Sequence, residues 1–390
     1  MKDFNVFIPT RLLFGAGAIG RLHQESLPGK KALIVTTAGK SVKKYGYLDK
    51  LMGELDKASV EYTVFDKILS NPILDHVHEG ADIARKENCD FVIGLGGGSS
   101  IDAAKAIAVS ATNEGNYCDY MAEGSGKSKE VKNAPLKIIA ITTTAGTGTE
   151  VNPWTVTTNR ALNEKICFGI DETYPVIAVV DPKLMVSVPA RFTAYQGFDA
   201  LFHSTECYIS KGASPYSEML NLEAIKCIGT NLETAVNHGD DIDARYYVAL
   251  GNTLSGMSDS ISSGISAHSL AHAMGGLHPE LPHGAALIMI CEEYYRFYAE
   301  KHACDEKMIN MAKAMGFENA SKASDFIDEL HGLKVACNVN NLKMSDYGIT
   351  KDEFESIAKH ARSDSGGLYD YDPCEFKDED AIEVLRKSYR

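Results

Sequence analysis

The sequence predicts a two-domain protein in which an α/β domain with a mostly parallel sheet precedes an all-helical domain. Three observations support this prediction. Short apolar runs alternate with amphipathic stretches in the first half, apolar residues recur at helical spacing in the second half, and 390 residues exceed what one core usually supports. Strands that alternate with helices favour a parallel sheet covered on both faces.

Five apolar runs are the expected strands of the sheet. They lie at residues 31–36, 62–65, 90–95, 136–141 and 176–180. Near-continuous apolar character is typical of parallel strands that are buried on both faces. Amphipathic stretches follow the first three runs, at residues 47–57, 74–87 and 101–112. After Asp181-Pro182 the strand-like runs nearly vanish, which places the boundary near residues 183–190 and gives domains 1–186 and 187–390.

Composition and charge exclude several classes of partner. The formal net charge of −14 disfavours nucleic acids and anionic membranes, because binding either requires clustered Lys and Arg side chains. No segment approaches about 18 uninterrupted apolar residues, so we expect no membrane-spanning helix. The nine cysteines are scattered without a CxxC pair, which indicates reduced thiols. With an acidic residue as early as Asp3, no secretory signal is expected, and the sequence predicts a cytoplasmic protein.

A glycine-rich turn joins the run at 90–95 to an alanine-rich helical stretch. Residues 94–100 are GLGGGSS, so backbone N–H groups and the helix dipole can receive a phosphate there. The turn lacks the Lys-Ser/Thr ending of a Walker loop, which disfavours nucleoside triphosphate hydrolysis. It also differs from the GxGxxG fingerprint and lies in the third βα unit. The alternative is a tight turn that binds nothing, with Asp102 only favouring the helix dipole.

A second loop of small residues follows the run at 136–141. Residues 142–149 are TTTAGTGT, a composition suited to contacts with ribose, phosphate or a nicotinamide carboxamide. The alternative is a surface loop whose hydroxyls cap a helix near Glu150. Two such loops after two strands of one parallel sheet converge on its carboxyl edge, where open α/β sheets bind ligands. The pair of loops is therefore stronger evidence than either loop alone for a ligand site at the carboxyl edge of this Rossmann-like sheet.

Histidine and aspartate residues gather in the predicted helical half. Asp199 and His203 are four residues apart and so share a helix face, His268 and His272 repeat that spacing, and His283 follows a short loop later. Imidazole and carboxylate together suit Fe²⁺, Zn²⁺ or Mn²⁺. A lone histidine is more often a hydrogen-bonded core or surface residue, but this group predicts a divalent metal site. The spacing leaves the choice between His268 and His272 open.

Together these segments resemble the iron-containing, or group III, alcohol dehydrogenases over nearly the whole chain. The motifs that carry the resemblance are Pro9-Thr10 with Phe14-Gly-Ala-Gly17, Asn71-Pro72, Gly96-Gly-Gly-Ser-Ser-Ile-Asp102, Thr143-Thr-Ala-Gly-Thr-Gly148, Asp199-Ala-Leu-Phe-His203, His268-Ser-Leu-Ala-His272 and Pro282-His283-Gly284. The resemblance implies a dehydroquinate synthase-like architecture, with an α/β dinucleotide-binding domain and an all-α C-terminal metal domain. It also implies a homodimer or a larger homo-oligomer.

The resemblance assigns roles to the clustered side chains. It implies that Asp199, His203, His268 and His283 bind one divalent metal, with Fe²⁺ favoured and Zn²⁺ as the alternative. His272 is then left as a catalytic proton-relay residue beside the metal. The interval from His272 to His283 is one residue longer than in familiar members of the family.

The resemblance implies a nicotinamide cofactor as well. The expected cofactor contacts are Thr37, Gly39, Ser41, Lys44, Asn71, Gly96, Gly97, Gly98, Ser99, Asp102, Thr143, Thr144, Thr147 and Lys165. Members that prefer NAD often carry an aspartate after the strand at 31–36, where it bonds the ribose 2′-hydroxyl, whereas this chain has Thr37. Residues 39–44 resemble the GGGSxKK stretch of NADPH-using butanol dehydrogenases, with Lys40 as an additional positive charge. We therefore predict NADP(H) over NAD(H).

These features predict a metal-dependent, NAD(P)-dependent alcohol dehydrogenase that exchanges a hydride with a small primary alcohol or aldehyde, such as butanol or butanal. The metal is expected to act as a Lewis acid on the substrate oxygen. The alternatives are a glycerol or 1,2- or 1,3-propanediol dehydrogenase of the same superfamily, a lyase like dehydroquinate synthase, and a non-catalytic metal- or nucleotide-binding protein. The spacing of the Asp-Ala-Leu-x-His and Pro-His-Gly motifs favours the alcohol dehydrogenase branch.

Overall fold

The structure is a computed structural model that describes residues 3–162 and 164–390. Contacts between residues divide the chain into two compact units. Ile8–Ser187 form one of them, the sheet unit, and residues 3–7 together with Val188–Arg390 form the other, the helical unit. Among the described residues, no helix is both long enough and apolar enough to span a lipid bilayer.

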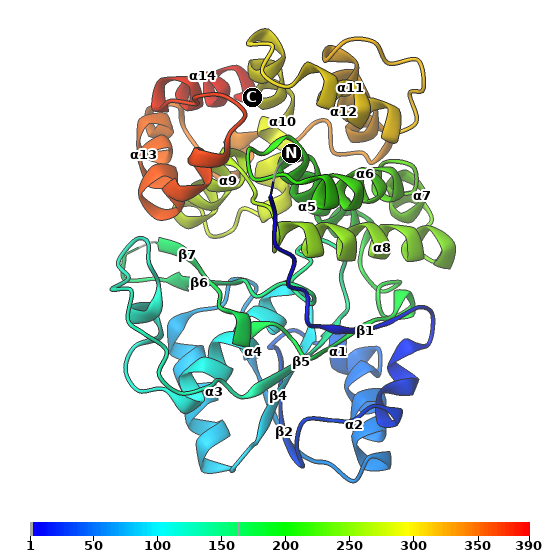
Figure 1. Ribbon diagram of the computed structural model, residues 1–390, viewed down its shortest axis with the longest axis vertical. Helices are drawn as coiled ribbons and strands as arrows, with labels where there is room; N and C mark the ends of the chain where they lie inside the picture. Colours follow the sequence, from blue (N-terminus) through cyan, green and yellow to red (C-terminus); the bar gives the residue numbers. More distant parts are fainter. Residues whose placement is uncertain (1–2, 163) are drawn as a thin grey trace. The chain divides into compact units, whose positions relative to one another are not determined.

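The sheet unit is built on six strands that all run parallel to their neighbours (Figure 1). Their order in the sheet is β1-β8-β5-β4-β2-β3. The strands are β1 (Arg11–Phe14), β2 (Lys31–Thr37), β3 (Glu61–Ile68), β4 (Phe91–Gly96), β5 (Lys137–Thr142) and β8 (Ile177–Val180). The helices are α1 (Ser41–Lys44), α2 (Tyr47–Lys57), α3 (Leu74–Lys86) and α4 (Gly98–Thr112), with 3₁₀ helices η1 (Ala18–Gln24), η2 (Tyr117–Tyr120), η3 (Asp171–Thr173) and η4 (Pro182–Leu184). The predicted α/β class is confirmed.

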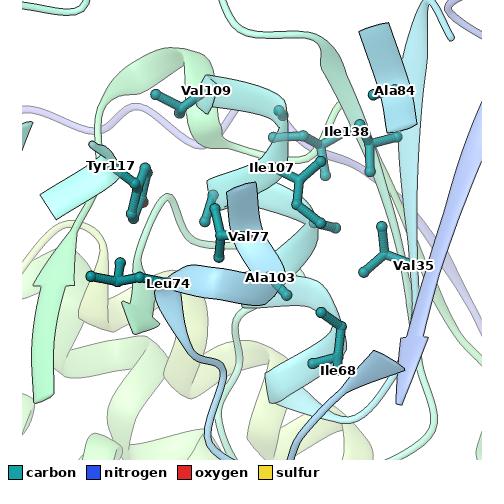
Figure 2. Packing of buried hydrophobic residues seen from close by; sticks show 14 of the residues in the cluster. Val35, Ile68, Leu74, Val77, Ala84, Ala103, Ile107, Val109, Tyr117 and Ile138 are labelled. Atoms are coloured by element: carbon teal, nitrogen blue, oxygen red, sulfur yellow. The ribbon is translucent and has the colours of Figure 1, made fainter. Parts of the chain in front are cut away.

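Alternate side chains of the strands enter two separate cores, one on each face of the sheet. In β2, Leu33 and Val35 join the core that contains α3 and α4, whereas Ala32 and Ile34 join the core that contains α2. All four side chains are completely buried. Figure 2 shows the first core, in which Val35 lies among residues of α3 and α4. Successive strand side chains point to opposite faces, so a strand covered on both faces requires a continuous apolar run.

The packing of α4 on the sheet depends on small residues. α4 is rich in alanine and buried along almost its whole length. A Cβ atom on Gly94 of β4 would come within 2.8 Å of the Ile101 Cα, so glycine is what allows the helix to approach the strand this closely. This packing holds the glycine-rich turn at the carboxyl end of β4 and at the amino end of α4.

The sheet unit also contains an antiparallel hairpin that the sequence analysis missed. β6 (Thr155–Asn159) pairs with β7 (Glu164–Phe168). β6 is largely polar and β7 begins with two charged residues, so neither shows the long apolar run of a buried strand. Thr158 N donates to Pro72 O at 2.7 Å, which ties the hairpin to the turn that follows β3.

The helical unit contains helices and, among its described residues, no strand, which confirms the predicted all-helical second half. Its helices are α5 (Ala190–Ile209), α6 (Pro215–Gly229), α7 (Leu232–Asn237), α8 (Ile242–Asp259), α9 (Ser266–Leu277), α10 (His283–Glu300), α11 (Asp305–Ala314), α12 (Ser324–Ala336), α13 (Phe354–Ser365) and α14 (Asp378–Ser388) (Figure 1). The 3₁₀ helices are η5 (Met344–Tyr347), η6 (Lys351–Glu353) and η7 (Gly366–Tyr371).

Residues 3–7 differ from the expected division, which placed the start of the chain in the first domain. The Phe4 ring stacks on the Tyr216 ring of α6, with ring centroids 6.5 Å apart. This aromatic contact explains why the segment belongs to the helical unit. Residues 1, 2 and 163 lie outside the described residues, so the domain range predicted from residue 1 is compared from residue 3 onward.

Candidate metal and cofactor sites

One face of α5 carries the first polar side chains of the metal site. Asp199, His203 and Glu206 follow one another at spacings of four and three residues, so they share a helix face. The Asp199 side chain is 7% exposed and the Glu206 side chain is 0% exposed. Ionisable side chains are almost never buried this far without a partner. Their partners therefore have to come from neighbouring helices.

Helices α9 and α10 bring two histidines to this face of α5. His268 lies in the first turn of α9, and His283 is the first residue of α10, directly after Pro282. Gly284 packs on α5, because a Cβ atom there would overlap the backbone carbonyl of Tyr195. A larger residue would force the two helices apart. The Pro-His-Gly sequence thus begins α10 where its histidine reaches the side chains of α5.

Three of the predicted metal ligands converge on one point. Asp199 Oδ1 lies 3.6 Å from His268 Nε2 and 3.5 Å from His283 Nε2. The candidate ligand atoms of these three residues all lie within 4.8 Å of one another. Two ligands of one tetrahedral metal, each about 2.1 Å from the ion, are about 3.4 Å apart. The observed distances are long for direct hydrogen bonds and suit donors that share one cation.

His203 and His272 lie beside this group of three. His203 Nδ1 is 3.9 Å from Asp199 Oδ1, and the His203 ring centroid is 4.3 Å from that of His268. The His272 ring centroid is 5.0 Å from that of His283 and 6.3 Å from that of His268. The structure therefore brings all five predicted side chains together. Of His268 and His272, which spacing could not separate, His268 belongs to the group of three.

The electrostatics of the place where these side chains converge favour a bound cation. Asp199 Oδ1, His203 Nδ1 and His268 Nε2 are buried and, within the described residues, make no hydrogen bond. Burial lowers the pKa of His268, but the carboxylates of Glu206 and Asp199 outweigh it and raise that pKa to about 10. The site therefore attracts either a proton or a metal ion. Buried oxygen and nitrogen atoms that make no hydrogen bond are suitable ligands for a divalent metal.

Glu206 is a functional candidate that the sequence analysis did not single out. Its Oε1 lies 2.7 Å from His268 Nδ1, and its Oε2 accepts a hydrogen bond from Ile265 N at 2.9 Å. The available signal was its position seven residues after Asp199, which is two helical turns along the same face.

The two predicted cofactor loops of the sheet unit contact one another at the carboxyl ends of β4 and β5. Thr143 N donates to Gly96 O at 2.9 Å. A Cβ atom on Gly98 would lie 2.6 Å from the Thr147 side chain, so the glycine lets the threonine loop pack directly on the turn. The expected cofactor contacts in these two loops are Gly96, Gly97, Gly98, Thr143, Thr144 and Thr147.

Three further expected contacts lie beside these loops. Lys165 Nζ of β7 donates to Asn71 Oδ1 at 3.4 Å, and Ser99 Oγ donates to the Ser70 carbonyl. These hydrogen bonds join the turn after β3 to the hairpin and to the start of α4. A lysine ammonium group next to a glycine-rich turn is suited to a phosphate. The hairpin thus supplies a cation beside the turn that follows β3.

The last expected contacts follow β2. Thr37 is the final residue of β2, Gly39 lies in the next turn, and Ser41 and Lys44 are the ends of α1. In a parallel sheet the carboxyl ends of all strands face the same edge. The topology therefore places the turns after β2, β3, β4 and β5 on one edge of the sheet unit.

Asp102 has different surroundings from the other expected contacts. Its Oδ1 accepts from Thr149 Oγ1 at 2.6 Å, and its Oδ2 accepts from Val156 N at 3.1 Å. Lys105 of α4 is completely buried and donates to Thr149 Oγ1 and to Trp154 O, both at 2.6 Å. Burial raises the pKa of Asp102, against the charge of Lys105 and these hydrogen bonds. The pair fastens the loop after β5 to α4, and a direct contact between Asp102 and a cofactor stays a prediction.

Comparisons with known proteins cover almost the entire chain. Residues 9–182 match the family described as iron-containing alcohol dehydrogenase, and residues 193–389 match the C-terminal region of the Fe-containing alcohol dehydrogenase family. A choline dehydrogenase of Bacillus subtilis (strain 168) is 36% identical over 372 residues, which cover 93% of this chain and 90% of that protein. An NAD-dependent methanol dehydrogenase of Bacillus methanolicus is 32% identical over 371 residues, which cover 92% of this chain and 93% of that protein.

A solved structure agrees with both units of the fold. An archaeal halo-thermophilic alcohol dehydrogenase from a Red Sea brine pool superposes with a TM-score of 0.93 at 32% identity, and the match covers 100% of each chain. The names of these relatives differ in the alcohol and agree in the reaction class. The chain therefore belongs to the iron-containing alcohol dehydrogenase family, whose members are oxidoreductases that use a divalent metal and a nicotinamide cofactor.

Proposed function

We propose that this protein interconverts a small primary alcohol, such as butanol, and its aldehyde. In the reducing direction the aldehyde, NADPH and one proton give the alcohol and NADP⁺. The observation that carries this proposal is the convergence of Asp199 Oδ1, His268 Nε2 and His283 Nε2, which are buried or half-buried in the helical unit. A redox enzyme of this family requires such a site, whereas a protein that only binds nucleotides does not.

The chain's own residues divide the work at the metal site. Asp199, His203, His268 and His283 would hold one divalent metal, for which we propose Fe²⁺, with Zn²⁺ as the alternative. When bound, the metal acts as a Lewis acid on the substrate oxygen while the nicotinamide exchanges the hydride. His272 Nδ1 is buried, so we assign the exchange of the proton to His272 Nε2.

The edge of the sheet unit is the proposed cofactor site. The glycine-rich turn at the start of the 15-residue helix α4 presents backbone N–H groups and the positive end of the helix dipole to the pyrophosphate. Thr144 and Thr147 lie against this turn and offer hydroxyl groups. Lys165, from the hairpin, adds a positive charge.

We infer a preference for NADP(H) from the residues that follow β2. Thr37 stands where an aspartate would repel a 2′-phosphate, and the nearby Lys40 and Lys44 are exposed. The lysine between them, Lys43, is already paired with Asp66. One matched relative is named NAD-dependent, so this choice depends on local residues and not on the family.

The cofactor proposal is tested by comparing kcat/KM for NADPH and NADH with the same aldehyde. We expect NADPH to be the better substrate. Thr37→Asp should lower kcat/KM for NADPH about fivefold or more, because two like charges about 4 Å apart repel by at least about 1 kcal/mol. A higher kcat/KM for NADH in the unmodified enzyme would overturn the proposal.

We also propose a cytoplasmic homo-oligomer, most simply a homodimer. Phe4, Phe7 and Met219 of the helical unit are 49%, 50% and 60% exposed, and Phe4 stacks on Tyr216, which is also exposed. Large exposed apolar side chains that gather in this way often mark an interface. The nine cysteines form no disulfide within the described residues, which fits a reducing compartment. Sedimentation equilibrium of the unmodified chain and of Phe4→Ser tests the assembly, and a monomeric unmodified chain would contradict it.

The activity is tested by following NADPH oxidation with a panel of aldehydes that includes butanal and 3-hydroxypropanal. Activity should disappear on chelation and return with Fe²⁺ or Zn²⁺. His268→Ala should lose bound metal and activity together, whereas His238→Ala, at an exposed position at the end of α7, should retain both. An active, metal-free His268→Ala enzyme would overturn the ligand assignment.

A further inference from the structure

We infer that Glu206 is a positioning residue for the metal site, which sets the tautomer and the orientation of His268. This inference rests on the proposed metal site. The Glu206 side chain is completely buried, and its Oε1 lies 2.7 Å from His268 Nδ1. A metal-binding imidazole commonly donates its second N–H to a carboxylate, which fixes the ring and raises its basicity.

The geometry determines which nitrogen of His268 carries the hydrogen. A carboxylate only accepts hydrogen bonds, so the contact with Glu206 requires the hydrogen on Nδ1. When a metal displaces the second proton of His268, the lone pair lies on Nε2, which is buried, makes no hydrogen bond within the described residues and lies 3.6 Å from Asp199 Oδ1. Glu206 therefore turns towards the metal site the one His268 nitrogen that can bind a metal.

The second oxygen of Glu206 fixes the carboxylate itself. Oε2 accepts a hydrogen bond from Ile265 N at 2.9 Å, at the residue that precedes α9. The carboxylate thus spans α5 and the start of α9, the helix that carries His268. With both oxygens engaged and no exposure to solvent, it has little freedom to rotate. A rigid partner of this kind keeps the imidazole in place when the metal is absent.

Charge supports the same role. Glu206 and Asp199 are the two carboxylates that act on His268, and both are buried. Two negative charges compensate a divalent cation, which makes its burial less costly than burial beside neutral histidines alone. A glutamine at position 206 would therefore remove charge from the site as well as change its hydrogen bonding.

Glutamine cannot reproduce the two hydrogen bonds of Glu206. If its oxygen faces His268 Nδ1, its NH₂ group meets the Ile265 N–H, and two donors oppose each other. If its NH₂ group faces His268 instead, Nδ1 has to accept, and the hydrogen moves to Nε2, the metal-binding atom. In either orientation the variant keeps nearly the same volume and loses the arrangement that the metal needs.

The test compares the metal affinity of three purified enzymes by competition with a chromogenic chelator for Zn²⁺ and Co²⁺. We expect Glu206→Gln to bind about 10- to 100-fold more weakly than the unmodified enzyme. The visible d–d bands of the Co²⁺ enzyme should also shift. Glu292→Gln is the matched control, because Glu292 of α10 accepts from His331 Nδ1 at 3.1 Å and from Lys334 Nζ at 2.7 Å, in a carboxylate–histidine contact of which neither member is a proposed ligand. It should bind metal as the unmodified enzyme does.

A second measurement does not depend on the folding of any variant. In the zinc-loaded, unmodified enzyme, ¹H–¹⁵N NMR of the histidine rings should show His268 protonated on Nδ1. A hydrogen on Nε2, or equal metal affinity in Glu206→Gln and the unmodified enzyme, would overturn the role of Glu206. If instead the unmodified enzyme binds no metal that His268→Ala removes, the metal site itself fails, and the two failures are distinguishable.

Discussion

Asp372 is a buried carboxylate whose replacement tests the electrostatics of the helical unit. Its side chain is completely buried, and Oδ1 accepts hydrogen bonds from Ser266 Oγ and Tyr298 OH, both at 2.9 Å. Oδ2 is also buried and has no hydrogen-bond partner among the described residues. The charged form of such a group is costly. We predict that Asp372→Asn makes the protein more stable at pH 8.

The direction of the effect follows from the surroundings of this carboxylate. Burial raises the pKa of Asp372 to about 7, helped by the negative charge of Glu206 and opposed by the hydrogen bonds from Ser266 and Tyr298. The groups that face it are Ser266 of α9, Tyr294 and Tyr298 of α10, and Glu206 of α5. The folded state binds the proton more tightly than the unfolded state, in which the pKa is near 3.8. The contribution of Asp372 to stability is therefore fully present below about pH 4 and is lost as the pH rises through about 7.

The magnitude follows from the same two pKa values. A rise from 3.8 to about 7 corresponds to about 4 kcal/mol of unfolding free energy, of which about 3 kcal/mol is lost between pH 5 and pH 8. Asparagine is neutral and keeps Oδ1 as an acceptor, but its buried NH₂ group has no partner at the Oδ2 position, which costs about 1–3 kcal/mol. The variant should therefore be about 1–3 kcal/mol more stable than the unmodified chain at pH 8 and within about 1 kcal/mol of it at pH 5.

The assay is urea unfolding of both proteins in chelator at pH 5 and pH 8, followed by far-UV circular dichroism. The chelator removes the contribution of metal binding. Asp325→Asn is the control of opposite sign, because hydrogen bonds from Ser321 N at 2.7 Å and Lys322 N at 3.1 Å lower the pKa of Asp325. That carboxylate contributes stability above its unfolded pKa, so its replacement should destabilise the protein at pH 8. An Asp372→Asn variant that is destabilised equally at both pH values would refute the reasoning.

Three further substitutions probe the sheet unit. Lys105→Met should cost about 3–5 kcal/mol of unfolding free energy, measured by urea unfolding with tryptophan fluorescence, because it leaves the buried Asp102 without its cation; a loss below about 1 kcal/mol would contradict this. Gly98→Ala should weaken NADPH binding at least about tenfold in a fluorescence titration, since the new Cβ atom would lie 2.6 Å from Thr147, and unchanged binding would show that the turn does not contact cofactor. Ile107→Ala should cost about 2–5 kcal/mol without changing the KM for NADPH, because Ile107 is completely buried away from the turn.

The strands that sequence predicts well are those buried on both faces. The apolar runs at 31–36, 90–95, 136–141 and 176–180 differ by one residue at each shifted end from the observed β2, β4, β5 and β8. Their burial leaves little room for polar residues, so the sequence pattern is strong. The β6–β7 hairpin escaped prediction for the opposite reason. Thr155–Asn159 contains one apolar residue, and in Glu164–Phe168 apolar and polar residues do not alternate.

The metal site shows where local spacing stops being informative. Asp199 and His203 share a helix, so four-residue spacing alone predicts that they are neighbours. His268 and His272 fit that rule equally well, and the choice between them depends on how α9 lies against α5 and α10. The structure places His268 in the group of three with His283, at a distance in sequence that no periodicity reaches. Resemblance to a family could supply this assignment, but the residues alone could not.

Buried charges show more sharply how far a site can be predicted from sequence. Lys105 lies three residues after Asp102 in an alanine-rich stretch of α4, and burial of a lysine is so costly that such a position also signals further acceptors. The acceptors are largely backbone and amide groups of Asn152 and Trp154, which have no sequence pattern that would identify them. Glu206 is the same case in the helical unit, since one of its two partners is the backbone N–H of Ile265. A sequence can thus show which charge needs a partner, but only the tertiary fold shows that the partner is a main-chain group.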